Sequence, residues 1–561
     1  MSDSHYAFWP KSMPRHMTMP QTNIFFNAIV SAARFPNKPY MIFYDTPVTF
    51  AEFFEEAEQI AGYLETECGV KKGDRVLLVM QNSPQCAIAY YGILRANAVV
   101  VPVNPMNLTN ELRHYVKDSG ASVAFTGQET YPNLKPLLTE GLASGDTGGL
   151  KHVIVAAYAD YIRRPTDLKL PDAVAAPRQA IGDAGAVLWS DALARNWKPG
   201  PQTAGPDDLC VMPYTSGTTG QPKGCMHTHR SVMYTMVAGR RWYQGGSDDV
   251  SLSVLPYFHV TGMQGGLNGA IFGGNTVVLM QRWDRDLAAQ LIERYKVTSC
   301  TFISTMVVDF LSSPNAGKYD LSSLTFMSGG GAAMPEAVAK KLEATYGLQY
   351  MEGYGLSETM SPTHLNPPDR PKKQCLGMPI SDTEARVVDP ATMKQLAAKQ
   401  IGEIIVRGPQ VFQGYWNNPD ATRQAFVEID GKTFFRTGDL GYVDEEGYYF
   451  FTDRLKRMIN AAGMKVWPAE VEAILYGHPA IQEACIIAAL DDRRGETVKA
   501  MVVLKPGHQG TLSEQDIIAW SREQMAAYKV PRIVTFIDTL PKSATGKINW
   551  RAMQDAEKAR A

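Results

Sequence analysis

The sequence predicts an α/β protein, with a large N-terminal domain of α/β layers that includes a small β subdomain, followed by a small C-terminal α+β domain. The length of 561 residues predicts more than one domain, because single hydrophobic cores stop growing near roughly 250–300 residues. Apolar and helical stretches alternate from Asp74 to Val123, which is typical of parallel βαβ units. A second α/β series begins after Asp453. We therefore expect domains at residues 1–455 and 456–561.

The first series contains two predicted strands, at residues 76–80 and 99–103, because each is a short, continuous apolar run. The helix that follows should open at Thr109 with Glu111 and close at Gly120. Residues 161–207 are rich in Pro, Ala, Gly and Asp and lack periodicity. That composition predicts a long surface connection.

The α/β pattern then resumes, with strands predicted at 209–213, 276–280 and 299–303 and helices at 287–295 and 335–346. From residue 402 to 451 the helical pattern vanishes and short β-rich pieces carry turn signals, which predicts a small β subdomain. After Asp453 the pattern predicts a helix from Pro468, strands at 484–489 and 498–504, and a helix from Ser513. The domain boundary is expected near Lys456.

The composition is that of a globular protein, with 45% hydrophobic and 20% charged residues. The formal net charge of −2 gives no basic footprint, so nucleic acid is not an expected partner. None of the seven cysteines has the C-x-x-C spacing of a zinc or redox site, and their scatter suits a reducing compartment. No signal-peptide core and no apolar run of about 18 residues is present. We expect a cytoplasmic protein without a transmembrane segment.

The segment YTSGTTGQPKG, from Tyr214 to Gly224, follows an apolar strand and combines hydroxyls and glycines before Lys223. Such a loop can wrap phosphate, since glycines let backbone N–H groups approach an anion and a lysine adds charge. A flexible linker is the alternative for this segment alone. The spacing does not match a P-loop, because Pro222 stands where the second glycine belongs. SGGGAAM does not satisfy G-x-G-x-x-G, so a dinucleotide-binding dehydrogenase loses support. G-x-S-x-G is absent, so an α/β-hydrolase loses support as well.

Three further segments carry candidate chemistry. YGLSET, from Tyr354 to Thr359, offers a ring that could stack on adenine and a carboxylate, Glu358, that could hold Mg²⁺. RTGD places Asp439 in a turn where its two oxygens could accept ribose hydroxyls. PKSATGK sets Lys547 on a turn near the C-terminus. Each segment alone is also consistent with an ordinary loop, turn or solvated lysine.

Together, these segments resemble the ordered signature of the adenylate-forming superfamily, which includes acyl-CoA synthetases, adenylation domains and luciferases. YTSGTTGQPKG, LPYFHVTGM, YGLSET, RTGD, DRLKRMINAAGMKVWPAEVE and PKSATGK occur in the family's order. The resemblance covers most of the chain. It implies an acid–CoA ligase of the fatty-acid–CoA ligase branch, with ATP, Mg²⁺ and coenzyme A as cofactors, a carboxylic acid as substrate, and a possible homodimer.

The resemblance also assigns roles to residues. Lys547 would contact the α-phosphate and the acyl carboxylate, with His259 beside that carboxylate and Glu358 as a third catalytic residue. Thr215 and Glu358 would hold Mg²⁺. The expected nucleotide-binding residues are Thr215, Ser216, Gly217, Thr218, Thr219, Lys223, Gly330, Gly331, Ala332, Tyr354, Gly355, Ser357, Asp439 and Arg454.

The C-terminal domain of the family is mobile, because the lysine that grips the carboxylate would obstruct the thiol of coenzyme A. Lys456 occupies the hinge position, and Gly463, Met464 and Lys465 lie on the segment expected to bind coenzyme A. Arg457 stands where many relatives have an acid, which puts the family's salt bridge there in doubt. Asn460 replaces the lysine of luciferases, which disfavours an oxygenase half-reaction.

The acid itself is less well defined by the sequence. The expected pocket wall is mainly apolar and contains several glycines, which favours a medium- or long-chain fatty acid. The alternatives are an aromatic or dicarboxylic acid, an enzyme that loads a carrier protein, and an inactive nucleotide-binding scaffold. The glycines from 262 to 269 either leave space for substrate or only allow close packing. The expected pocket residues are Tyr234, Val260, Gly262, Met263, Gly266, Ser304 and Met306.

Overall fold

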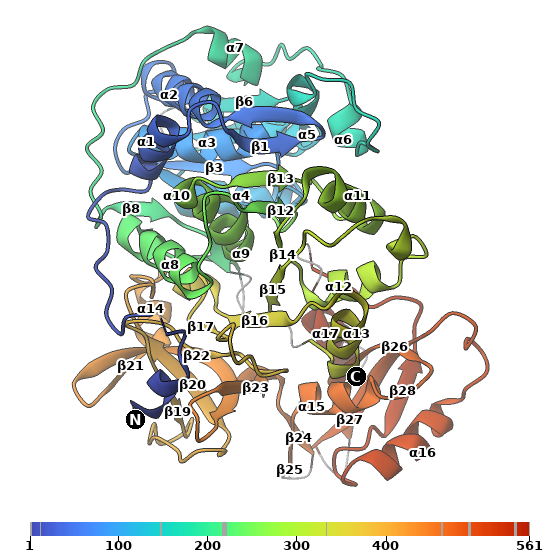
Figure 1. Cartoon of the computed structure of the whole chain (residues 1–561). Coiled ribbons are helices and arrows are strands. Elements are labelled where there is room, and N and C mark those ends of the chain that lie inside the picture. Colours follow the sequence, from blue (N-terminus) through green and yellow to red (C-terminus); the bar gives the residue numbers. More distant parts are fainter. Residues whose placement is uncertain are drawn as a thin grey trace.

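The structure is a computed structural model that describes residues 3–11, 13–145, 148–215, 221–331, 334–461, 464–491, 495–543 and 547–559. Two large sheets with their helices form the upper body in Figure 1, and the β subdomain and the C-terminal part lie below them. The predicted α/β class is confirmed. No helix within these ranges has both the length and the apolar character needed to cross a membrane.

The first large sheet has seven strands among the described residues, in the order β11-β8-β4-β3-β5-β6-β7. Its inner strands are parallel, as the predicted βαβ pattern requires. The strands predicted near residues 76 and 99 are β3 and β4, both buried. The bounds are β3 Arg75–Val79, β4 Val99–Pro102, β5 Val123–Gly127, β6 His152–Ala156, β7 Ala186–Leu188, β8 Leu209–Val211 and β11 His227–Thr228.

The second sheet has nine strands in the described ranges, in the order β18-β17-β16-β15-β14-β12-β13-β1-β2. Strands β12 to β16 run parallel, so their carboxyl ends meet at one edge. The bounds are β1 Pro39–Phe43, β2 Thr46–Thr49, β12 Val250–Ser253, β13 Thr276–Leu279, β14 Ser299–Thr301, β15 Phe326–Gly330, β16 Tyr350–Tyr354, β17 His364–Leu365 and β18 Met378–Pro379.

The helices of these layers include the predicted one after residue 109. The Glu111 carboxylate accepts the backbone N–H of Leu108 at 2.8 Å, and Gly120 closes the helix with φ of 66°. The helices are α1 Phe25–Arg34, α2 Phe50–Thr66, α3 Pro84–Arg95, α4 Thr109–Ser119, α5 Tyr131–Ala143, α6 Asp172–Ala175, α7 Trp189–Ala194, α8 His229–Trp242, α9 Val260–Gly262, the π-helix η4 Met263–Asn268, α10 Gly269–Gly273, α11 Arg285–Tyr295, α12 Ser304–Leu311 and α13 Glu336–Tyr346.

The expectation for residues 161–207 is partly wrong. This stretch contains α6, β7 and α7, and β7 pairs in parallel with β6 at the edge of the seven-stranded sheet. Trp189 anchors it, because its side chain is 2% exposed and packs on Phe125 with ring centroids 6.0 Å apart. The three-residue strand is too short to give a periodic signal in the sequence.

The predicted β subdomain is confirmed as a five-stranded sheet among the described residues, although helix α14, Pro419–Ala425, interrupts the stretch expected to lack helices. Asn418 caps α14 by accepting the N–H of Ala421 at 3.0 Å, and Pro419 occupies its first turn. The strands are β19 Glu384–Val388, β20 Gly402–Arg407, β21 Phe426–Ile429, β22 Lys432–Val443 and β23 Tyr449–Arg454.

The C-terminal part has its own apolar core, formed where α15 and α16 cover one sheet. The helix expected from Ser513 is α16, and Ser513 caps it because its hydroxyl accepts the N–H of Asp516 at 3.3 Å. The elements are β24 Ile459–Ala461, β25 Met464–Val466, α15 Pro468–Leu475, β26 Ile481–Asp491, β27 Gly495–Leu504, α16 Glu514–Gln524, β28 Ile533–Phe536 and α17 Trp550–Lys558.

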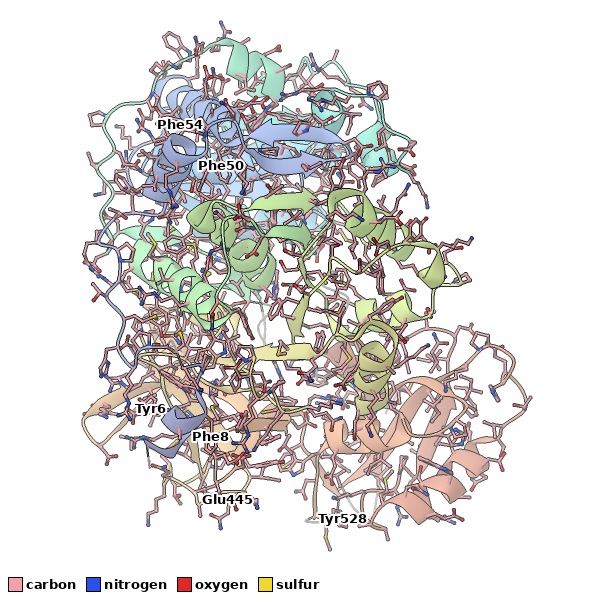
Figure 2. All side chains as sticks on the ribbon, viewed as in Figure 1. Tyr6, Phe8, Phe50, Phe54, Glu445 and Tyr528 are labelled. Atoms are coloured by element: carbon pink, nitrogen blue, oxygen red, sulfur yellow. The ribbon has the colours of Figure 1, made fainter. Side chains whose placement is uncertain are left out.

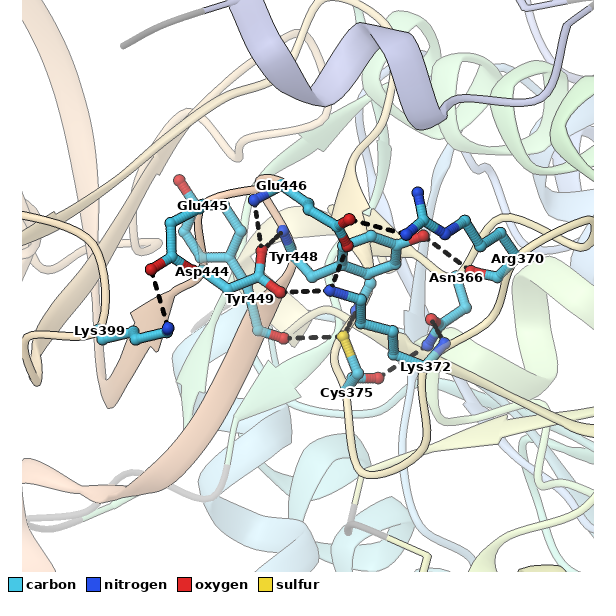
Figure 3. A network of polar contacts seen from close by, with 11 residues as sticks. Asn366, Arg370, Lys372, Cys375, Lys399, Asp444, Glu445, Glu446, Tyr448 and Tyr449 are labelled. Carbon is cyan, nitrogen blue, oxygen red and sulfur yellow. Dashed lines mark hydrogen bonds and ion pairs between the residues drawn. The ribbon is translucent and has the colours of Figure 1, made fainter.

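The N-terminal segment packs on the β subdomain, where Tyr6 and Phe8 are visible in Figure 2. Trp9 is 8% exposed and contacts Trp242 of α8 edge to face, with ring centroids 5.5 Å apart. Next to this segment, Figure 3 shows Lys372 paired with Asp444 and Glu446 at 2.5 and 2.6 Å. These contacts tie the β17–β18 loop to the β22–β23 turn.

Three buried histidines make stability pH-dependent. Burial lowers the pKa of His227 and His229 to about 4 and that of His364 to about 3. The unfolded chain binds protons below its ordinary histidine pKa near 6.5, so stability is full above that pH and is lost as the pH falls toward 4. Each histidine contributes on the order of 3 kcal/mol to this loss.

We expect the melting temperature of the wild type to be lower at pH 5 than at pH 7. The variant His227→Gln keeps a donor for the Ser357 carbonyl. In this variant, the difference in melting temperature between pH 7 and pH 5 should be smaller than in the wild type. The matched control is His508→Gln at an exposed position. The same change in melting temperature between the two pH values in the His227 variant and in the wild type would contradict this assignment.

Candidate active site

A cavity of about 3460 Å³ lies where the carboxyl ends of the nine-stranded sheet meet the β subdomain and the C-terminal part. Its wall includes Gly330 at the end of β15, Thr215 of β9, Asp439 of β22 and Lys547. Ligands of open α/β sheets bind at this edge. The cavity therefore brings together residues from all the sequence segments with candidate chemistry.

Asp439 and Arg454, expected to hold ribose, line the cavity, and the buried Tyr354, expected to hold adenine, contacts Asp439 without lining the cavity itself. The Tyr354 hydroxyl donates to Asp439 Oδ2 at 2.7 Å, and Arg454 Nε lies 3.1 Å from Asp439 Oδ1. The pairing of β22 with β23 places Asp439 opposite Arg454. The Asp439 charge raises the pKa of Arg454, which stays cationic.

The phosphate-loop segment has a described stem. Thr215 of β9, Tyr214–Thr215, pairs antiparallel with Lys223 of β10, Lys223–Gly224, so the two ends of the loop lie together. The expected binding residues Ser216, Gly217, Thr218 and Thr219 lie outside the described residues. The Lys223 amine lies 4.5 Å from the centre of the Tyr415 ring. Both Thr215 and Lys223 line the cavity.

Glu358 is a buried carboxylate on the same side, in the short helix η6, Ser357–Thr359. Desolvation raises its pKa above the ordinary value, while the Tyr415 hydroxyl, which donates to Oε1 at 2.8 Å, opposes that shift. No group of three or more His, Cys, Asp or Glu side chains in the described ranges could hold a metal. The Glu358 carboxylate and the Thr215 hydroxyl, which both line the cavity, are oxygen groups of the kind that Mg²⁺ takes together with substrate phosphates.

Lys547 lies inside the cavity, directly over Gly331. A β-carbon built on Gly331 would come within 2.5 Å of Lys547 Cε and 2.6 Å of Nζ. Burial and then the Arg454 charge lower the pKa of the Lys547 amine, with Asp439 opposing. The lysine therefore reaches the ends of the N-terminal strands although it belongs to the last residues of the chain.

His259 faces this lysine. It caps helix α9, with Nδ1 accepting the N–H of Thr261 at 3.3 Å. Burial, and next the charge of Lys547, lower the pKa of His259 to about 3. The imidazole is therefore neutral at physiological pH and adds no positive charge beside the lysine.

The glycine-rich and YGLSET segments form the floor between these groups. Gly330, Gly331, Gly355 and Ser357 line the cavity, and Ala332 lies outside the described residues. A side chain at Gly330 would meet the backbone of Gly353, and one at Gly355 would meet Ser361. The Ser357 carbonyl accepts from His227 Nε2 at 2.7 Å, which fixes the segment to β11.

The hinge candidate Lys456 lines the cavity within η7, Leu455–Arg457. Burial and the nearby charges of Lys223 and Arg551 lower its pKa. Of the residues expected to bind coenzyme A, Gly463 and the side chain of Lys465 lie outside the described part of the chain, and Met464 is 54% exposed.

Arg457, which departs from the common pattern, makes several polar contacts next to the hinge candidate Lys456. Its guanidinium pairs with Glu472 at 2.5 Å, donates to the Ile486 carbonyl at 3.1 Å and lies 3.9 Å from Asp453. Asp453 is fully buried and accepts the N–H of Ala469 at 2.7 Å. Arg457 therefore makes a salt bridge with Glu472 on α15, which is a different pair from one that an acid at this position would make.

The acyl-pocket candidates divide into two groups. Val260, Ser304 and Met306 line the cavity. Tyr234 and Met263 are core residues, because the Tyr234 hydroxyl donates to the Ser381 carbonyl and Met263 lies under Tyr90, both with no exposed area. Side chains at Gly262 and Gly266 would collide with the Leu255–Pro256 backbone and with Ser253. The prediction that Tyr234, Met263, Gly262 and Gly266 form the wall of the acyl pocket is therefore wrong, because these four residues serve close packing.

Sequence reasoning missed several lining residues. Tyr415 donates to Glu358, and the Lys223 amine lies over its ring, yet a single tyrosine gives no signal by itself in the sequence. Gly239 and Thr235 lie on the cavity face of α8. A glycine inside a helix is a weak signal that could have identified this face, since glycine is unfavourable there.

The fold and this cavity together define an adenylate-forming enzyme, in which a C-terminal lysine reaches a site built by the N-terminal sheets. Comparison with known proteins extends this result. The family model for AMP-binding enzymes matches residues 30–416, and the model for the C-terminal domain of AMP-binding enzymes matches residues 470–547. The chain therefore belongs to the AMP-binding enzyme family.

Individual relatives cover nearly the whole chain. A long-chain-fatty-acid–CoA ligase of Bacillus subtilis (strain 168) is 35% identical over 560 residues, covering 98% of this chain and 97% of that protein. A protein of the same name from Escherichia coli O157:H7 is 32% identical and covers 94% and 93%. The crystal structure of an anthranilate CoA ligase with anthranoyl-AMP superposes with a TM-score of 0.84 at 26% identity, covering 97% and 98%.

Proposed function

We propose that this protein is an AMP-forming acid–CoA ligase that activates a medium- or long-chain fatty acid through an acyl-adenylate and transfers the acyl group to coenzyme A. The observation that carries the proposal is the position of the Lys547 amine, over Gly331 and close enough to His259 to lower its pKa. The amine thus lies between the Asp439–Arg454 pair and the acyl side of the cavity. ATP and coenzyme A are consistent with the family.

In the first step, a carboxylate oxygen attacks the α-phosphorus of ATP, the bond to the bridging oxygen breaks and pyrophosphate leaves with the electron pair. Negative charge grows on the phosphoryl oxygens, so aimed cations and donors carry the catalysis. The Lys547 amine supplies such a cation. His259 is neutral and adds a hydrogen-bonding group next to the acyl carboxylate without a second charge.

The residues near the phosphate loop fit a magnesium ion held jointly with ATP. Glu358 and the Thr215 hydroxyl, both on the cavity wall, are the oxygen ligands that we assign to it. The ion would supply charge neutralisation on the phosphates of ATP. Tyr415 holds the Glu358 carboxylate in orientation by its 2.8 Å hydrogen bond.

In the second step the thiol sulfur of coenzyme A bonds to the acyl carbon and loses its proton to solvent, and AMP leaves with the electrons of the broken acyl–oxygen bond. With Lys547 in the cavity, the amine occupies the carboxylate side that the thiol must approach. We infer that the chain after Lys456 turns between the two steps and brings Gly463, Met464 and Lys465 toward the cavity. The proposed domains remain residues 1–455 and 456–561.

The substrate assignment rests on the cavity and on the relatives. The acyl side is lined by Val260, Met306 and residues of α8. The Bacillus subtilis and Escherichia coli relatives carry the name long-chain-fatty-acid–CoA ligase, which supports an aliphatic acid. The anthranilate CoA ligase shows that the same fold also serves aromatic acids, so an aromatic acid belongs in the test.

A panel of acids tests the proposal directly. Hexanoate, palmitate, benzoate and adipate are each incubated with the protein, ATP, Mg²⁺ and coenzyme A, and AMP release is measured. We expect the highest kcat/KM for the alkanoates, with release that requires both acid and coenzyme A. Turnover with benzoate or adipate but with no alkanoate would overturn the substrate class. Transfer to a carrier protein in place of coenzyme A would overturn the acceptor.

A further inference from the structure

The glycines near the acyl cavity differ in what a side chain would meet. A β-carbon at Gly262 or Gly266 would collide with neighbouring atoms, and one at Gly269 would lie 2.8 Å from the Gln264 carbonyl. Gly265 is different: the nearest atom to its β-carbon position is Thr301 Oγ1, 4.0 Å away. Of this group, only Gly265 leaves usable space. It is exposed to the cavity and belongs to the π-helix η4.

Gly239 shows the same property on the neighbouring helix. It lies inside α8, lines the cavity and has no atom within 4 Å of its β-carbon position. Helix interiors disfavour glycine, and here no close packing and no positive φ requires it. The empty space beside Gly239 therefore belongs to the cavity.

The two glycines lie on adjoining walls of one passage. Thr235 and Gly239 of α8, and Tyr243 directly after its last residue, follow each other at a spacing of four and line the cavity. Helix α8 is tied to η4 because the Gln264 side-chain amide, next to Gly265, donates to the Val232 carbonyl at 2.9 Å. Across the passage, Thr301 of β14 contacts Ser328 of β15 with hydroxyl oxygens 3.1 Å apart.

The passage continues well beyond the reacting end. The cavity wall follows β15 from Gly330, beside Lys547, back to Phe326 and Thr325. A strand rises about 3.3 Å per residue, so this wall spans roughly 16 Å, about the length of a dozen carbons in a zigzag. At the far end the lining residues Gln244, Gly245 and Thr325 are exposed, so the cavity reaches the surface there.

We propose that Gly239 and Gly265 are the residues that determine acyl chain length, because they keep open the passage through which the distal half of a long alkyl chain extends past η4. The inference rests on the proposed function and assigns long, unbranched acids as the preferred class. Short acids end before the two glycines and need no space beside them. A larger side chain at either position would project into the passage from its wall and limit the length of the acyl chain that fits.

The test compares kcat/KM for palmitate and hexanoate in coenzyme A-dependent AMP release, using the full-length protein. In Gly239→Leu and Gly265→Val the ratio of palmitate to hexanoate should fall at least about 100-fold, since a filled pocket discriminates strongly by size. Hexanoate turnover should fall far less than palmitate turnover. Thermal unfolding of each variant checks that the protein is folded.

Gly317→Leu is the matched control. Gly317 also has no atom within 4 Å of its β-carbon position, but it lies on the surface, away from the cavity. Its palmitate-to-hexanoate ratio should equal that of the wild type. A folded Gly239 or Gly265 variant with an unchanged ratio, or with equal losses for both acids, would overturn the inference alone. A wild type that activates neither alkanoate would overturn the proposed substrate class as well.

Discussion

Replacing Lys547 with alanine is expected to lower the rate of acyl-adenylate formation about 10²–10³-fold, the usual effect of losing one group aimed at transition-state charge. The amine is held in the cavity over Gly331, between His259 and Arg454, so solvent offers no substitute at that place. Exchange of labelled pyrophosphate into ATP in the presence of palmitate measures this step. Transfer from preformed acyl-AMP to coenzyme A should be far less affected.

Lys558→Ala on α17 is the control for removal of a C-terminal charge, because Lys558 lies on the surface of the same part of the chain. It should exchange pyrophosphate at the wild-type rate. A Lys547 variant that keeps more than half of the wild-type exchange would exclude the lysine from the adenylation step.

The second large effect is expected for Gly331→Ala. The new methyl group would lie within 2.5 Å of Lys547 Cε. Because the lysine end is flexible and the β15 backbone is not, the amine should move out of its position. A displacement of about 1 Å at a reacting group can reduce the rate about 10²-fold. We expect a loss of that size in pyrophosphate exchange.

Backbone strain must be separated from this displacement, since Gly331 has a φ of 83°. Gly347→Ala is a suitable control, because Gly347 has a φ of 67° and no atom within 4 Å of its β-carbon position. Both variants should lose about 1–2 kcal/mol of stability from the left-handed backbone, but only Gly331→Ala should lose adenylation. Equal exchange rates in the two variants would refute the displacement argument.

Much of the fold could be predicted because it depends on local patterns. The buried strands β3 and β4 are continuous apolar runs, and α4 and α16 have capping residues at their predicted ends. Short elements could not be predicted in this way. Strand β7 and helix α14 are stabilised by long-range contacts, on β6 and within the β subdomain, that leave no periodic trace in the sequence.

The candidate site divides in the same way. Lys547, Asp439 and Glu358 could be found because a short motif surrounds each, and they line one cavity. The acyl wall could be predicted only in part, with Val260, Ser304 and Met306 correct, since the same residue types serve packing and substrate binding. Gly262 and Gly265 are three residues apart, but one faces a backbone and the other an open passage. Only the three-dimensional neighbours of a glycine separate these two cases.

The buried Asp453 carboxylate has an energetic consequence for turnover. Its bonds to Ala469 and Arg457 run from the segment before Lys456 to the segment after it, so a turn at that residue breaks them. Burial already raises the pKa of Asp453 to about 6, and without these partners the ionised form would lose still more of its support. A turn at this joint changes both the burial and the partners of Asp453, so its protonation is coupled to reorientation, and the balance between the two half-reactions should depend on pH near 6.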